Sequence, residues 1–266
     1  MIARAALAGA AALMLAACAS TAARAPAVAT VSSGYLSDEA LTRLAAAVPP
    51  PPGPGSPRDR EDMAASARLA ALEDTDRWLL ATSHAELRPP LALQHFDCVL
   101  GVRLGSAETP RLDGLMAKVF HDADSVAEQV KARARRPRPV GDDPDRNSCQ
   151  RVNAAARASA SYPSGSAAVA AAYAEALVRL EPERAEAVRR IGREIGISRL
   201  ICAMHYPSDV EAGEAIGRAV VAKASMTPSF RSDAEAARAE LEAARATGRT
   251  NPGCAAERAA LATPLP

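Results

Sequence analysis

The chain has 266 residues, with 32 basic and 31 acidic side chains and a net charge of +1. A charge so close to zero excludes the basic footprint of a nucleic-acid-binding protein. Apolar residues make up 48% of the chain, mostly as Ala and Leu, whereas aromatic residues make up only 3%. This composition suits helices packed through small side chains and is poor material for β-sheets, which favour β-branched and aromatic residues. The length fits one large domain or two small ones.

The first residues predict export rather than fold. Arg4 precedes an apolar run from Ala5 to Ala17 that is too short for an ordinary membrane span. The run ends in the letters LAAC, at Cys18, and this ending is similar to a bacterial lipobox, in which the cysteine is acylated. We therefore predict a signal peptide over residues 1–17 and a lipid anchor on Cys18. The residue after Cys18 is not Asp, which favours the outer membrane and a periplasmic location. A plain secretory signal is the alternative.

The rest of the chain is predicted to be helical. Residues 18–34 are rich in Ala, Thr, Ser and Pro and predict a flexible tether. The proline run that begins at Pro49 is a break that no helix tolerates. Apolar periodicity then predicts helical segments at residues 59–87, 91–104, 112–135, 167–180, 182–195, 210–224 and 232–247. The segment 167–180 is small and apolar on nearly all sides, which indicates a central, buried helix. We predict an all-α domain over residues 35–250, followed by a C-terminal tail at 251–266.

Four cysteines follow Cys18 in the sequence: Cys98, Cys149, Cys202 and Cys254. In an oxidising compartment they can form two disulfides, and three pairings are open. Their spacing is too wide for a zinc site of the CxxC type, so no metal site is predicted.

Two polar stretches lie where helix packing does not require them. The first runs from Lys131 to Pro139 and places several cations at a helix end and in the turn after it. Helix-end capping by basic residues explains it equally well. The second, Tyr162-Pro-Ser-Gly-Ser166, precedes the predicted buried helix, and a helix N-terminus with small residues binds anions. A tight turn with a serine cap is the alternative.

The third polar stretch runs from Ser198 to Asp209 and contains His205. Asp209 follows His205 by four residues and is expected to accept a hydrogen bond from its ring. The other ring nitrogen is then free to act as a nucleophile or base. Residues 208–211 also predict a capping box that opens a helix, with Ser208 as the cap and Glu211 three residues on. A purely structural His–Asp pair at a helix start is the alternative.

Taken together, the three stretches have the spacing K-x6-RP, PSG and SR-x5-H-x3-D, which resembles the signature of the PAP2 phosphatase and vanadium haloperoxidase superfamily. The matching residues are Lys131, Arg138, Pro139, Pro163, Ser164, Gly165, Ser198, Arg199, His205 and Asp209. Further stretches, including Gly34-Tyr35-Leu36 and the proline run, resemble the secreted class A bacterial acid phosphatases over roughly residues 34–230. The resemblance implies a single PAP2-type helical bundle that is exported and hydrolyses phosphomonoesters without a metal or other cofactor.

The resemblance also implies a role for each matching residue. His205 would attack phosphorus to form a phosphohistidine, and Asp209 would orient it. Cations and amides would hold the phosphoryl oxygens, because phosphoryl transfer is catalysed mainly by positioning and charge stabilisation. The residues implied in this binding are Lys131, Arg138, Arg199 and the amides around Ser164 and Gly165.

One position departs from the family pattern. The second motif normally reads PSGH, and its histidine protonates the leaving group, but this chain has Ser166 there. A serine hydroxyl is a poor proton donor, and general acid catalysis is typically worth about 10²–10⁴-fold. Three hypotheses follow: a phosphatase that uses another acid, a phosphate-binding pseudoenzyme lipoprotein, or another chemistry of the superfamily, such as lipid phosphate hydrolysis or halide oxidation.

The expected partners follow from this resemblance. They are a small phosphomonoester or inorganic phosphate, and a membrane reached through the lipid on Cys18; no nucleic acid is expected. The sequence leaves the oligomeric state open, and a homo-oligomer is one alternative.

Overall fold

The computed structural model describes residues 33–104 and 109–266, and in these ranges it contains helices and no strand. The predicted all-α class is confirmed. The predicted signal peptide, Cys18 and nearly all of the tether lie outside the described residues. The elements are α1 (Asp38–Ala46), α2 (Pro57–Arg68), η1 (Leu69–Leu72), α3 (Asp76–Ser83), η2 (Leu91–Phe96), α4 (Asp97–Leu100), α5 (Pro110–Lys131), α6 (Pro139–Asp142), α7 (Ala154–Ala158), α8 (Gly165–Leu180), η3 (Pro182–Arg184), α9 (Ala185–Ile201), α10 (Pro207–Ala224), α11 (Pro228–Ala246) and α12 (Cys254–Leu261).

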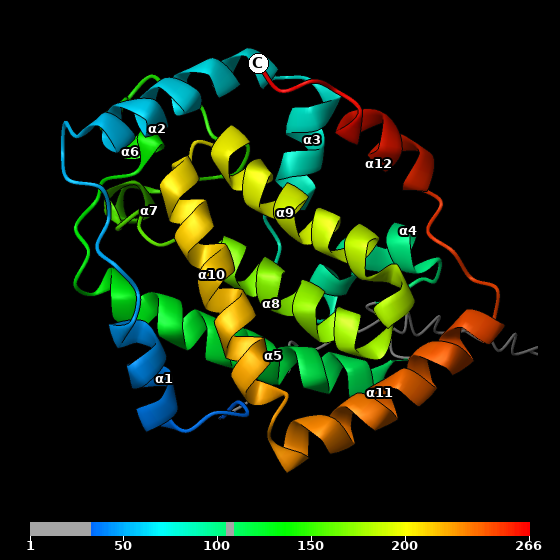
Figure 1. Ribbon diagram of the computed structural model, residues 1–266. Helices are drawn as coiled ribbons and strands as arrows, with labels where there is room; N and C mark the ends of the chain where they lie inside the picture. Colours follow the sequence, from blue (N-terminus) through cyan, green and yellow to red (C-terminus); the bar gives the residue numbers. More distant parts are fainter. Residues whose placement is uncertain (1–32, 105–108) are drawn as a thin grey trace, which may run out of the picture.

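Helix α8 is the centre of the bundle, with α5, α9 and α10 packed around it (Figure 1). Its side chains are mostly alanine and nearly all buried, as the sequence predicts. Small residues let the neighbouring backbones come close. A Cβ atom added at Gly213 or Gly217 of α10 would collide with carbonyl oxygens of Ser164 and Ala168. The start of α8 is therefore held closely against α10, and the Ser164 amide also donates to the Asp209 carbonyl at 2.9 Å.

The predicted segment 59–87 is interrupted in the structure. Helix α2 ends at Arg68, and α3 begins at Asp76 after η1 and a turn at Asp74, whose φ is +61°. Thr75 caps α3 by accepting a hydrogen bond from the amide of Trp78 at 3.3 Å. The apolar spacing continues across this turn, so periodicity alone does not reveal the break. The segment 91–104 is likewise only the short η2 and α4, which end at Gly101 with a φ of +66°.

The C-terminal segment 251–266 contains helix α12, which packs against α3 (Figure 1). Cys254, at the start of α12, is bonded to Cys98, and Cys149 is bonded to Cys202. Of the three pairings that the sequence leaves open, the structure has this one. In the described ranges, no helix combines the length and the hydropathy that crossing a membrane requires.

Candidate active site

The three polar stretches meet at one end of α8. Lys131 is the last residue of α5, Arg199 lies near the end of α9, and His205 lies two residues before α10. A Cβ atom at Gly165 would lie only 3.1 Å from the Nζ atom of Lys131. Arg138 Nη1 is 3.2 Å from His205 Nε2. The structure therefore brings together the cations and the histidine that the spacing predicts.

His205 is buried with one ring nitrogen fixed and the other facing cations. Nδ1 lies 2.8 Å from the carbonyl oxygen of Ser161. A carbonyl only accepts, so Nδ1 carries the proton and Nε2 keeps its lone pair. Burial lowers the pKa of His205 well below its usual value, and the positive charges of Arg138, Arg199 and Lys131 lower it further. The ring is therefore neutral below the ordinary histidine pKa, and its Nε2 accepts a hydrogen bond from Arg138 Nη1 at 3.2 Å.

The predicted hydrogen bond between His205 and Asp209 is wrong. The Asp209 carboxylate lies 3.9 Å from His205 Nδ1, beyond hydrogen-bonding distance. It accepts instead from the Tyr206 amide at 2.7 Å and the Ser161 hydroxyl at 2.5 Å. Ser161 thus binds His205 through its carbonyl and Asp209 through its hydroxyl. Asp209 orients the histidine through Ser161 and not directly.

The physical reason is the point at which α10 begins. The predicted capping box has Ser208 as its cap and Glu211 as its acidic member, but the helix starts at Pro207. Asp209 is then the third helical residue, and its carboxylate satisfies the amide just before the helix. Glu211 faces solvent and forms an ion pair with Arg58 at 2.5 Å. That part of the prediction is also wrong.

Arg136 is a buried member of the site that the sequence does not single out. Its guanidinium contacts the carboxylates of Asp59 and Asp62, each at 2.9 Å, and Asp209 at 2.8 Å. It also lies over the Tyr206 ring, 4.3 Å from the centroid. One guanidinium therefore balances three carboxylates and ties α2 to α10. The one sequence signal is the i, i+3 spacing of Asp59 and Asp62, which places them on one face of α2.

Arg199 is in the opposite situation, because it is a buried cation for which no carboxylate partner exists in the described part of the chain. Its Nη2 donates to Gln150 at 2.8 Å, whereas Nε and Nη1 are buried without an acceptor. Burial, and then the charge of Arg138, lowers the pKa of Arg199 to about 10. Buried donors without partners are costly, so the site is built to receive an anion.

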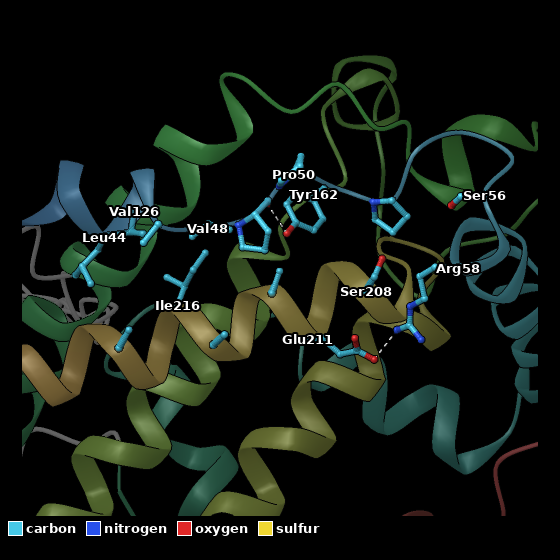
Figure 2. Close-up of a pocket in the computed structure, with 16 residues that line it drawn as sticks. Leu44, Val48, Pro50, Ser56, Arg58, Val126, Tyr162, Ser208, Glu211 and Ile216 are labelled. Atoms are coloured by element: carbon cyan, nitrogen blue, oxygen red, sulfur yellow. Dashed lines mark hydrogen bonds and ion pairs between the residues drawn. The ribbon is translucent and has the colours of Figure 1, made fainter.

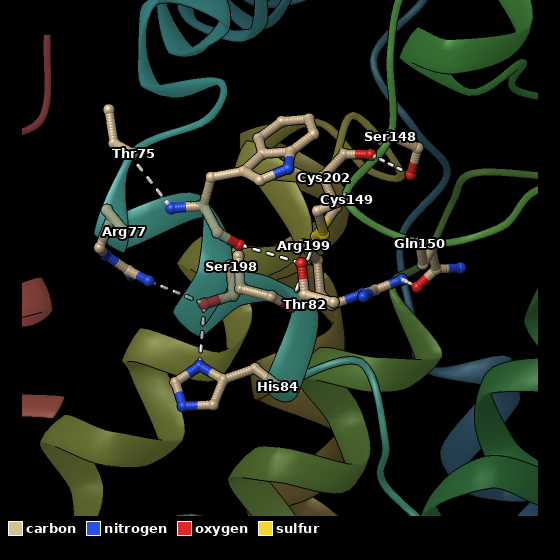
Figure 3. The surroundings of a disulfide bond; sticks show 12 residues. Thr75, Arg77, Thr82, His84, Ser148, Cys149, Gln150, Ser198, Arg199 and Cys202 are labelled. Carbon is tan, nitrogen blue, oxygen red and sulfur yellow. Dashed lines mark hydrogen bonds between the residues drawn. A yellow bond between two sulfur atoms is a disulfide. The ribbon is translucent and has the colours of Figure 1, made fainter. Parts of the chain in front are cut away.

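The Cys149–Cys202 disulfide and a buried network lie next to Arg199 (Figure 3). Ser198 accepts from Arg77 at 3.0 Å and donates to the Glu194 carbonyl at 2.9 Å. His84, which lies outside the three polar stretches, has Nδ1 2.9 Å from the Ser198 hydroxyl. The serine of the third motif therefore fixes the helical turn that presents Arg199.

The start of α8 offers two free backbone donors. The Ser164 side chain caps the helix by accepting from the Ala167 amide at 3.1 Å. The Ser164 amide donates to the Asp209 carbonyl at 2.9 Å and is not available to a ligand. The amides of Gly165 and Ser166 have no acceptor among the described residues, and they lie at the positive end of the helix dipole. Of the amides predicted around Ser164 and Gly165, that of Ser164 is already bonded, whereas those of Gly165 and Ser166 are available to an anion.

A large apolar cavity of 660 Å³ lies elsewhere, between α1, the proline run and α10 (Figure 2). Leu44, Val48 and Ile216 line it, and the Arg58–Glu211 ion pair lies at its far end. Tyr162 and Ser208 of the polar stretches also line it, but none of the described residues predicted to bind phosphate or to act in catalysis does. In those same ranges, no three His, Cys, Asp or Glu side chains are grouped to hold a metal ion.

Replacing Arg199 by methionine tests the anion site. We expect the variant without ligand to gain about 1–3 kcal/mol in unfolding free energy, because two unpaired buried donors are removed. We also expect it to lose most of the stabilisation that inorganic phosphate gives the parent, which for a simple site is about 2.7 kcal/mol at a hundredfold excess over Kd. Thermal unfolding with and without phosphate measures both effects. Equal phosphate stabilisation in parent and variant would contradict the assignment.

Comparison with known proteins points to one family. The PAP2 superfamily model matches residues 119–231. An acid phosphatase of Zymomonas mobilis is 31% identical over 201 residues, which are 76% of each chain. A non-specific acid phosphatase of Salmonella typhi is 31% identical over 73% of this chain and 78% of its own, and one of Providencia stuartii is 27% identical over 78% and 84%. Among solved structures, a transmembrane PAP2 type phosphatidylglycerolphosphate phosphatase from Bacillus subtilis aligns with a TM-score of 0.46 and 20% identity, over 70% of this chain and 90% of that one.

Proposed function

Because the chain belongs to the bacterial non-specific acid phosphatases of the PAP2 superfamily, we propose that it hydrolyses phosphomonoesters through a phosphohistidine formed on His205. The observation that carries the proposal is the state of His205. Its Nδ1 proton is held by the Ser161 carbonyl, and its Nε2 faces the Arg138 guanidinium at 3.2 Å. A neutral, oriented imidazole beside unpaired positive charge is the arrangement that nucleophilic attack on a phosphate dianion needs.

In the proposed first step, Nε2 attacks phosphorus and the ester P–O bond breaks. The Arg199 donors that lack partners, Lys131, Arg138 and the free amides of α8 bind the phosphoryl oxygens. Arg provides two-pronged contacts to these oxygens, while Lys acts as a point charge. In the imidazolium that forms, the proton stays on Nδ1, which donates to the Ser161 carbonyl, and the Asp209 carboxylate lies 3.9 Å from Nδ1. In the second step, water attacks phosphorus, the P–N bond breaks and phosphate leaves.

We further propose that the enzyme is exported and is anchored to the outer membrane through Cys18. The lipobox supports the anchor. The two disulfides support export, because such bonds persist in oxidising compartments such as the periplasm.

A second candidate is a phosphate-binding pseudoenzyme, and the observation that favours it is Ser166. This residue stands where the family has its histidine acid, while the anion-binding residues are all retained. Hydrolysis of p-nitrophenyl phosphate measured against pH separates the two. Phosphate binding with negligible turnover would establish the second candidate and reject the first.

Replacing Ser166 by histidine is expected to raise turnover, because an imidazole delivers a proton that a serine hydroxyl does not. The gain is expected to be larger for alkyl phosphates, whose leaving groups are basic, than for p-nitrophenyl phosphate. The gain in turnover is expected to be at most the usual contribution of general acid catalysis, which is about 10²–10⁴-fold. Steady-state kinetics on both substrates provide the measurement. A uniform gain on both substrates would contradict the explanation.

A further inference from the structure

A small cavity beside Ser166 contains a carboxylic acid that the mechanism above does not use. The cavity measures 180 Å³ and lies between the start of α8, helix α5 and the chain before η2. Ser166 and Gly165 line one side, and Asp124 of α5 lines the other. The space next to Ser166, where the family's histidine would extend, therefore holds another titratable group.

Asp124 lies on the same side of Gly165 as the phosphate-binding lysine. A Cβ atom at Gly165 would be 3.1 Å from Lys131 Nζ and 3.9 Å from Asp124 Oδ1. Asp124 and Lys131 are seven residues apart, so both lie on one face of α5. The Asp124 side chain is half-buried, and its carboxylate has no hydrogen-bond partner in the described part of the chain. It is free to bond to a substrate oxygen.

We propose that Asp124 is the general acid and base of this phosphatase and does the work of the missing histidine. The inference rests on the proposed phosphatase function. In the first step, the Asp124 carboxyl gives its proton to the ester oxygen while Nε2 of His205 bonds to phosphorus, so that the alcohol leaves neutral. In the second step, the Asp124 carboxylate takes a proton from the attacking water. The P–N bond breaks, phosphate leaves, and Asp124 is protonated again.

The surroundings of Asp124 fit a proton donor in acid. Burial raises the pKa of the Asp124 carboxyl, and the Glu128 carboxylate raises it further. Lys131, Arg88 and His121 act in the opposite direction, yet the pKa remains above its ordinary value. The protonated form is then present at acidic pH, where His205 is still neutral.

Glu86 is the other carboxylate that lines this cavity. It is exposed, and its carboxylate already accepts a hydrogen bond from the Arg88 amide at 2.8 Å. It therefore provides a matched control, because Glu86→Gln removes a negative charge from the same cavity without removing the proposed acid.

The test is the dependence of kcat/KM on the leaving-group pKa, over a series from p-nitrophenyl to alkyl phosphates. Asp124→Asn is expected to lower kcat/KM for alkyl phosphates by about 10²–10⁴-fold, with a much smaller loss for p-nitrophenyl phosphate. Glu86→Gln is expected to leave the slope of this dependence unchanged. Adding Ser166→His to Asp124→Asn is expected to restore activity on alkyl phosphates. Vanadate binding by Asp124→Asn shows that the anion site is intact.

The inference and the proposed function fail in different ways. Suppose that the parent hydrolyses p-nitrophenyl phosphate in a His205-dependent manner. If Asp124→Asn then lowers kcat/KM equally for all substrates, or for none of them, the assignment of Asp124 is overturned and the proposed phosphatase function is not. If the parent has no His205-dependent turnover, both are overturned.

Discussion

His205→Ala is expected to reduce hydrolysis of p-nitrophenyl phosphate by on the order of 10⁴- to 10⁶-fold, as loss of a covalent nucleophile does in other hydrolases. Alanine removes the ring whose Nδ1 is oriented by the Ser161 carbonyl and whose Nε2 faces the Arg138 guanidinium. The anion site itself is not changed, since Arg199 keeps its unpaired donors. The variant should therefore still be stabilised by inorganic phosphate. Activity within tenfold of the parent would contradict the nucleophile assignment.

The dependence of turnover on pH provides a second test of His205. A lowered pKa means that His205 stays neutral as the pH falls below the ordinary histidine value near 6.5. Turnover is therefore expected to persist well below that pH. If turnover falls with an apparent pKa close to 6.5, the nucleophile is a histidine in an ordinary environment, and the role of Arg138 and Arg199 in keeping it neutral is wrong.

Arg136→Met is expected to have the largest effect on stability, about 3–5 kcal/mol lost from the unfolding free energy. The substitution leaves the carboxylates of Asp59, Asp62 and Asp209 close together without their cation. Urea denaturation at neutral pH measures the loss. Arg136 opposes the burial that raises the pKa of the Asp209 carboxyl, so its loss raises this pKa further and the folded variant takes up a proton at Asp209 before the unfolded chain does as the pH falls. The deficit is therefore expected to shrink in acid.

Arg218→Met provides the matched control for that experiment. Arg218 and Glu214 form an ion pair at 3.2 Å on the surface of α10, and such pairs contribute about 0–1 kcal/mol. If Arg136→Met costs no more than this control, the three-carboxylate network does not hold α2 against α10.

The sequence predicts the components of the site better than their contacts. The resemblance of the three stretches to the PAP2 signature identifies Lys131, Arg138, Arg199 and His205, and the structure places these residues at one end of the central helix. It does not predict that the Asp209 carboxylate accepts from the Tyr206 amide, since this depends on α10 starting two residues earlier than the capping pattern indicates. Short-range sequence patterns predict the helix to which a residue belongs. Its hydrogen-bond partners depend on the exact first residue of that helix, which such patterns do not fix.

Contacts between distant segments are the other part that the sequence does not reveal. Arg136 meets Asp59 and Asp62 across more than seventy residues, and Asp124 belongs to no motif. Both are positioned by the packing of α5 and α10 on the central helix. The central helix itself is predicted correctly, because a run of small apolar residues has no polar face to expose.

Trapping the covalent intermediate tests directly whether His205 is the nucleophile. The purified protein is mixed with p-nitrophenyl phosphate, quenched in alkali within the first turnovers and digested, and the peptides are analysed by mass spectrometry. We expect one phosphoryl group on the peptide that carries His205, and on the His205 ring itself. Steady turnover with no phosphoryl group on His205, or with one on a different residue, would contradict it.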